Sequence, residues 1–182
     1  FLLDVSGDMS GPPILAMELG VQLLANELMN LAQDMARSIG ISVITFGTSA
    51  RVIIPLTPLD RFVAPQLSAD GLCELGAAIC LLSRMLDHVI PSDRVSGIGK
   101  TKPLVILLMS GEPTDSWQTE LHEFNSQHSK YPPPLIWALG LGNQVDFSVL
   151  GTITPNTIPV SDLTSDLFRA VLSDWVGESL DN

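Results

Sequence analysis

The chain has 182 residues, of which 46% are hydrophobic, 16% charged and 5% aromatic. This length and composition exclude a disordered or fibrous protein and predict one compact domain, residues 1–182, with an aliphatic core. The formal net charge of −11 argues against nucleic-acid and anionic-membrane partners, because the field of the molecule would repel both. The longest apolar runs, such as Leu104–Met109, are far shorter than the roughly 20 residues that a membrane-spanning helix needs.

The hydrophobic periodicity predicts strands that alternate with helices along the chain. Strands are predicted at Phe1–Val5, Ile41–Phe46, Arg51–Leu56, Pro103–Met109, Leu135–Leu139 and Thr157–Val160. Helices are predicted at Ile14–Ile39, Leu72–Ile90, Trp117–His128, Val145–Leu150 and Leu163–Leu180. Pro12 and Pro13 fit the first turn of the first helix, Gly40 is expected to end that helix, and Pro91 is expected to end the second.

The connections between these elements point to the fold class. The short turn Gly47–Ala50 predicts that the two strands beside it are antiparallel. Thr57–Asp70 is predicted to be a loop or to contain a short helix, and Ser92–Lys102 to be a surface loop. The alternation of strand and helix elsewhere predicts an α/β fold in which helices cover both faces of a mainly parallel, doubly wound sheet.

Two loops that follow predicted strands carry clusters of oxygen-bearing side chains. One is Asp4–Gly11, which places Asp4, Ser6 and Asp8 at alternate positions, and the other is Ser110–Asp115. In doubly wound sheets, ligands bind beyond the carboxyl ends of the strands, so both loops are candidates for one shared site. Oxygen ligands at this spacing are typical of a site for a hard cation such as Mg²⁺.

The sequence of these loops resembles a known family. Asp4–Gly11 reads Asp-Val-Ser-Gly-Asp-Met-Ser-Gly and resembles the metal-ion-dependent adhesion site, or MIDAS, of von Willebrand factor A (VWA) domains. Ser110–Asp115 resembles the Asp-Gly-Glu-Pro-Thr-Asp loop of the TerY-type, tellurium-resistance-associated branch of bacterial VWA proteins. Gly71–Ala78 is similar to the segment that supplies a threonine ligand, and Leu167–Val176 to the closing Phe-x-x-x-Trp-Val helix, so the resemblance covers nearly the whole chain.

This resemblance implies a single VWA domain over residues 1–182, with a six-stranded doubly wound sheet and the antiparallel Arg51–Leu56 strand at one edge. The MIDAS-equivalent positions would be Asp4, Ser6, Asp8, Cys73 and Ser110, where the family usually has Asp, Ser, Ser, Thr and Asp.

Two interpretations of the degenerate MIDAS positions stay open. In the first, they hold Mg²⁺, Mn²⁺ or Ca²⁺, although Cys73 offers a poor ligand for a hard cation, Ser110 lacks a carboxylate, and Asp8 is longer than the usual serine. In the second, no ion binds, and the Asp and Ser side chains cap the following helix and accept hydrogen bonds from the loop backbone.

Membership of this family also implies a role in binding other proteins, with a protein kinase and a PP2C-type phosphatase as candidate partners and a scaffold role in bacterial stress-response or defence signalling. The docking face is expected to consist of three loops, Asp4–Ser10, Asp70–Glu74 and Ser110–Trp117. Its candidate partner-binding residues are Asp8, Ser10, Asp70, Glu74, Glu112, Thr114, Asp115 and Trp117. For Trp117, a contact anchor on the rim and a residue packed in the chain's own core are both plausible.

An enzymatic role is not expected, because neither a Gly-x-Ser-x-Gly elbow nor a Cys–His pairing is apparent in the sequence. The alternatives are a small Mg²⁺-dependent phosphoryl-transfer enzyme that uses Asp4 and Asp8, and a purely structural subunit of a larger assembly. The spacing of Asp4 and Asp8 disagrees with the Asp-x-Asp pair that such enzymes place after their first strand.

The cysteines and histidines carry weaker signals. Cys73 and Cys80 are predicted to lie on one helix with Cα atoms roughly 10 Å apart, which excludes a disulfide between them. Two free thiols fit a reducing, cytoplasmic environment. His88, His122 and His128 show no metal-ligand spacing and are interpreted as surface or helix-end residues.

Overall fold

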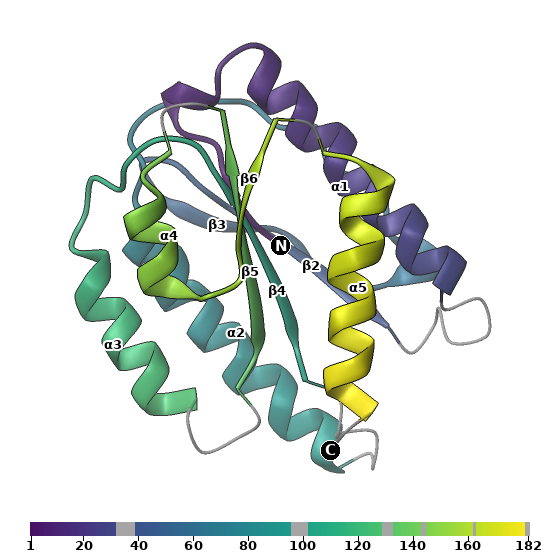
Figure 1. Cartoon of the computed structure of the whole chain (residues 1–182). Coiled ribbons are helices and arrows are strands. Elements are labelled where there is room, and N and C mark those ends of the chain that lie inside the picture. The colour runs from purple at the N-terminus through teal and green to yellow at the C-terminus, as the bar shows by residue number, and fades with distance from the viewer. Residues whose placement is uncertain (32–38, 96–101, 129–132, 143–144, 162, 181–182) are drawn as a thin grey trace.

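The computed structural model describes residues 1–31, 39–95, 102–128, 133–142, 145–161 and 163–180, with only the backbone described for 90–95 and 177–180. Its centre is a six-stranded sheet in the order β3-β2-β1-β4-β5-β6 (Figure 1). The strands are β1 (Leu2–Asp4), β2 (Gly40–Phe46), β3 (Ala50–Pro58), β4 (Leu104–Met109), β5 (Leu135–Leu141) and β6 (Thr157–Val160). Only the pairing of β3 with β2 is antiparallel, so the predicted sheet and its antiparallel edge strand are confirmed.

Helices cover both faces of this sheet. They are α1 (Pro12–Leu31), α2 (Leu75–Val95), α3 (Trp117–His128), α4 (Phe147–Ile153) and α5 (Ser165–Leu180), with two 3₁₀ turns, η1 (Gly7–Met9) and η2 (Leu59–Arg61). In Figure 1, α1 and α5 lie side by side on one face, and α2, α3 and α4 lie on the other. The doubly wound α/β class is therefore confirmed.

The central strands are apolar because both of their faces are buried. Successive side chains of a strand point to opposite faces, so Leu3 of β1 packs under α1 and α5, whereas Leu2 packs under α2 and α3. We call the apolar cluster between the sheet and α1 and α5 the first core, and the cluster between the sheet and α2 and α3 the second core. In the same way, Ile106 and Leu108 of β4 pack in the first core, and Leu107 packs in the second. This explains why β1 and β4 appear in the sequence as continuous apolar runs rather than alternating ones.

Three boundary predictions were wrong. Gly40 does not end the first helix, because Ile39 already lies outside any helix and Gly40 begins β2. Residues 32–38 of the predicted first helix lie outside the described residues, as do residues 96–101 of the loop predicted at Ser92–Lys102. The start of that predicted loop, residues 92–95, is helical and belongs to α2. Pro91 does not stop α2, whose backbone continues to Val95; the proline φ angle near −65° is compatible with a helix, at the cost of one backbone hydrogen bond. The third error places Cys73 inside α2, although this helix begins at Leu75.

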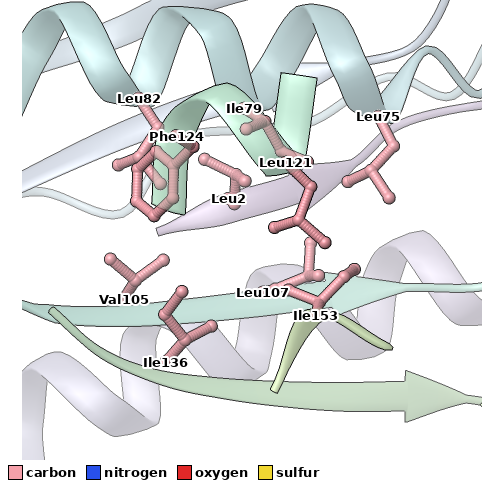
Figure 2. A pocket seen from close by; sticks show the side chains of 10 residues that line it. All are labelled: Leu2, Leu75, Ile79, Leu82, Val105, Leu107, Leu121, Phe124, Ile136 and Ile153. Atoms are coloured by element: carbon pink, nitrogen blue, oxygen red, sulfur yellow. The ribbon is translucent and has the colours of Figure 1, made fainter. Parts of the chain in front are cut away.

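A small apolar cavity lies inside the second core, between the sheet and α2 and α3 (Figure 2). Its volume is about 20 Å³, and its lining is entirely aliphatic or aromatic: Leu2, Leu75, Ile79, Leu82, Val105, Leu107, Leu121, Phe124, Ile136 and Ile153. A water molecule needs polar partners, so none is expected here, and the space is far smaller than the roughly 300 Å³ or more of a typical ligand pocket. It is therefore a packing defect. Among the described helices, none is both long and apolar enough to span a membrane.

Candidate functional site

Three loops meet at the carboxyl end of the sheet, where the strand order reverses between β1 and β4. The loop after β1, purple at the top of Figure 1, donates from Gly7 N to Gly71 O at 2.9 Å. In return, Asp70 N donates to Val5 O at 2.8 Å. The loop after β4 joins the same cluster, because Thr114 N donates to Cys73 O at 2.8 Å. The structure thus brings together the three loops that were expected to form one face, including Asp70–Glu74, which precedes α2.

Asp4 lies at the centre of these loops and is completely buried, with 0% of its surface exposed. Its Oδ1 atom accepts a hydrogen bond from Ser6 N at 2.8 Å, and its Oδ2 atom accepts one from Ser110 N at 3.1 Å. The Cys73 thiol also points to Oδ2, at 3.8 Å. Burial raises the pKa of Asp4, while these donors and the nearby Ser6 hydroxyl act in the opposite direction. Neutral donors therefore satisfy the carboxylate geometrically without balancing its charge.

Ser6 and Asp8 carry the side-chain oxygen atoms of the site that have the fewest hydrogen bonds to other described residues. Ser6 is 2% exposed, and its Oγ atom has no hydrogen-bond partner among the described residues, although its proximity to Asp4 affects the pKa of that residue. Asp8 is exposed and lies against the loop after β4: a Cβ atom at Gly111 would come within 2.7 Å of Asp8 Oδ2. Gly111 has a φ of +92°, a backbone conformation that favours glycine.

Cys73, which the family resemblance aligns with a threonine ligand, is a buried neutral donor in this structure. It is 3% exposed, and burial raises its pKa, with further contributions from the negative charges of Asp4, Asp115 and Asp8. A protonated thiol is a poor ligand for a hard cation. Both cysteines are free, as expected, but the reason given from the sequence was wrong, because Cys73 precedes α2 and is not on the helix that carries Cys80.

The side chains at the MIDAS-equivalent positions fit Mg²⁺ poorly. Mg²⁺ needs a near-octahedral shell of oxygen atoms, whereas here Cys73 presents an S–H group and both oxygens of Asp4 already accept protein donors. Within the described part of the chain, no group of three or more His, Cys, Asp or Glu side chains is arranged to hold a metal ion. For Asp4, the predicted acceptance of hydrogen bonds from the loop backbone is confirmed, since it accepts from Ser6 N and Ser110 N, whereas the predicted helix-capping role was wrong for this residue.

The candidate partner-binding residues fall into three groups by exposure. Five side chains face solvent: Asp8, Ser10, Asp70, Glu112 and Thr114. Glu74 and Asp115 are half-buried, and Asp115 accepts hydrogen bonds from Gly76 N and Ala77 N at 3.1 and 3.2 Å. Trp117 is 5% exposed and packs in the second core, so its core interpretation is confirmed.

Sequence reasoning missed two residues that shape this face. The Thr48 hydroxyl accepts a hydrogen bond from Leu72 N at 3.1 Å, and it packs so closely on Gly71, whose φ is +80°, that no side chain fits there. Leu72 itself is 53% exposed, which makes it the large apolar residue of the rim. The sequence offered two signals, Gly71 beside Leu72 and the turn composition of Gly47–Ala50 around Thr48. Neither signal identifies a contact between the Gly47–Ala50 turn and the loop that contains Gly71 and Leu72.

The Ser83–His128 contact was also missed, and it lies away from these loops. Ser83 Oγ is 2.9 Å from His128 Nε2 and donates to Gln127 Oε1 at 3.0 Å, which links α2 to α3. Ser83 and His128 are 8% and 3% exposed, and the His128 ring packs on Phe124 with centroids 4.7 Å apart. His128 does end α3, as expected, but it is buried. A serine–histidine pair enclosed in this way stabilises a helix interface and has no access to a substrate.

Comparison of the sequence with models of known protein families and with curated proteins finds no match. The family resemblance therefore rests on the loop and helix motifs themselves.

Proposed function

We propose that this chain is a non-enzymatic protein-interaction module, a VWA domain of the TerY type spanning residues 1–182, which docks partners through the loops at the carboxyl end of its sheet. The observation that supports this function best is the mutual anchoring of the three loops by backbone hydrogen bonds. A surface fixed in this way loses little conformational entropy when a partner binds.

In this proposal the exposed rim makes the contacts. Asp8, Asp70 and Glu112 supply negative charge around the apolar side chain of Leu72. Such a combination favours a partner surface with basic groups around an apolar residue. The proposed setting is the bacterial cytoplasm, with a protein kinase or a PP2C-type phosphatase as partner in stress-response or defence signalling, by analogy with TerY-type proteins.

The docking surface is tested by reversing charges on the rim. The variant Asp8→Lys/Asp70→Lys/Glu112→Lys changes three exposed acids of the loops, and Asp87→Lys/Glu123→Lys/Asp174→Lys changes three exposed acids on α2, α3 and α5 by the same total charge. With purified candidate kinase or phosphatase, we expect the rim variant to lose at least about tenfold in affinity, and the control to change much less. Equal losses would mean that only net charge matters, and the proposed face would then be wrong.

Metal dependence is tested separately by calorimetric titration of Mg²⁺, Mn²⁺ and Ca²⁺ into chelator-treated protein. The poor fit of the side chains predicts no saturable binding. A saturable heat that disappears in both Asp4→Ala and Asp8→Asn would instead establish a metal-dependent face. The second variant guards against a loss that reflects only misfolding around the buried Asp4.

A further inference from the structure

The N-terminus of α2 is held by a side chain from a different loop. Gly76 and Ala77 are the second and third residues of this helix, so their N–H groups have no acceptor within it. Asp115 accepts both: Oδ1 lies 3.1 Å from Gly76 N, and Oδ2 lies 3.2 Å from Ala77 N. A cap of this kind is normally supplied by the residue just before the helix, whereas Asp115 is 39 residues from Gly76 in the chain.

The residue beside Asp115 strengthens the same connection. Thr114 donates to Cys73 O from its backbone N at 2.8 Å and from its hydroxyl at 3.1 Å. Gly76 permits the close approach, because a Cβ atom there would lie 2.9 Å from Asp115 Oδ2 and 3.0 Å from Trp117 Cα. Two adjacent residues of the loop after β4 are thus fastened to the segment that begins α2 by hydrogen bonds in both directions.

We infer that Asp115 is a positioning residue that latches the Ser110–Ser116 loop onto α2. Both oxygens of its carboxylate are engaged by α2, so Asp115 serves the docking face by holding Glu112 and Thr114 in place rather than by contacting a partner. The consequence for partner binding rests on the proposed function, but the latch itself is a property of the isolated chain.

The latch is tested by amide hydrogen exchange on the free protein. In Asp115→Ala, we expect the amides of Gly76, Ala77 and Thr114 to exchange roughly tenfold faster, the order expected for a lost helix cap. Asp115→Asn keeps one acceptor oxygen, so we expect its amide exchange rates to lie between those of the parent and those of Asp115→Ala. Denaturant unfolding of each variant separates this local effect from a loss of global stability. Unchanged exchange at Thr114 in Asp115→Ala would overturn the inference.

A second variant distinguishes a latch from a simple helix cap. In Asp115→Ala/Glu74→Ser, the serine at the residue before α2 can cap the helix locally but cannot hold the loop after β4. We expect the double variant to restore slow exchange at Gly76 and Ala77 while Thr114 stays fast. Recovery at Thr114 as well would show that Asp115 only caps α2, and the positioning role would be rejected.

Failure of the latch and failure of the proposed function give different results. If faster exchange at Thr114 shows that the loop is released in Asp115→Asn, and partner affinity falls as well, both the latch and the proposed docking face are supported. If the loop is released and affinity is unchanged, the latch stands and the docking face lies elsewhere. If exchange at Thr114 does not change, the latch fails whatever the partner does.

Discussion

Two buried carboxylates in this molecule have pKa values shifted in opposite directions, although burial alone raises the pKa of both. Asp4 accepts hydrogen bonds from Ser6 N and Ser110 N, with the Cys73 thiol 3.8 Å away, and burial raises its pKa. Glu27 of α1 is 7% exposed and pairs with Arg169 of α5, whose Nε and Nη2 atoms lie 2.9 and 3.2 Å from its two oxygens. The hydrogen bond from Arg169 lowers the pKa of Glu27 more than burial raises it.

The difference teaches that hydrogen-bond satisfaction and charge compensation are separate requirements. A guanidinium meets both at Glu27, where the pair joins two helices and leaves nothing for a ligand to supply. Neutral N–H and S–H donors meet only the first requirement at Asp4, so negative charge stays uncompensated below an acidic rim. The α1–α5 contact has no such charge deficit, so we assign the proposed function to the loop face and not to that contact.

The largest effect is expected when the Asp4 acceptor is removed. Asp4→Ala leaves the Ser6 and Ser110 N–H groups buried without a partner, at roughly 1–3 kcal/mol for each, so we expect a loss of about 2–6 kcal/mol in the free energy of unfolding. Urea denaturation measures it. A loss below about 1 kcal/mol would show that the loops rearrange to satisfy these donors and that Asp4 does not organise them.

The next test removes the charge of Asp4 but keeps an acceptor. Because the pKa of Asp4 is raised in the folded protein above its ordinary value of 3.8, the folded state keeps the proton longer than the unfolded state, and stability declines as pH rises through that window. The stability of Asp4→Asn relative to the parent should therefore increase from pH 3 to pH 7. A relative stability that stays flat or falls with rising pH would contradict the account.

Glu27→Gln should show the opposite pH dependence. The pKa of Glu27 is lowered in the folded protein from its ordinary value of 4.5, so its ionised form adds stability above that pH and loses it as pH falls through the folded-state pKa. We expect Glu27→Gln to be less stable than the parent at pH 7 and to approach it at pH 3. Thermal melts at both pH values check this, with the neighbouring Gln22→Glu, on the exposed side of α1, as control.

The smallest effect on the free energy of unfolding is expected from a substitution in the uncharged second core. Val105→Ile adds one methylene beside the apolar cavity of about 20 Å³, and we expect a gain of up to about 1 kcal/mol that does not vary with pH. A loss would mean that the space is too small or wrongly shaped for the added group. This variant provides a baseline without ionisation for the two carboxylate series.

The sequence predicted those features of the fold that depend on local patterns. Apolar runs and turn residues located all six strands, and the loops after β1 and β4 were expected to share a site because parallel strands end at the same edge. The first residue of α2 was misplaced because Leu72 and Cys73 continue the apolar pattern of the helix, although the backbone of Cys73 is engaged by Thr114.

Long-range pairing was beyond the reach of the sequence. Glu27 and Arg169 are 142 residues apart, and nothing local marks either as a partner of the other. The roles of Asp115 and Thr114 were equally hidden, since an acidic loop residue has the same appearance whether it faces solvent or caps a distant helix. Individual site residues could be nominated from motifs, but their division into exposed, latched and buried groups required the structure.

The most direct test of the comparison is the pH titration of the side-chain carboxyl carbons of Asp4 and Glu27 by NMR. Assignments follow from Asp4→Asn and Glu27→Gln. We predict that Asp4 titrates above its ordinary pKa of 3.8 and Glu27 below its ordinary pKa of 4.5. If Asp4 titrates at or below 3.8, its charge is already compensated within the fold, and the claim that the loop face carries unbalanced negative charge for a partner to meet would be contradicted.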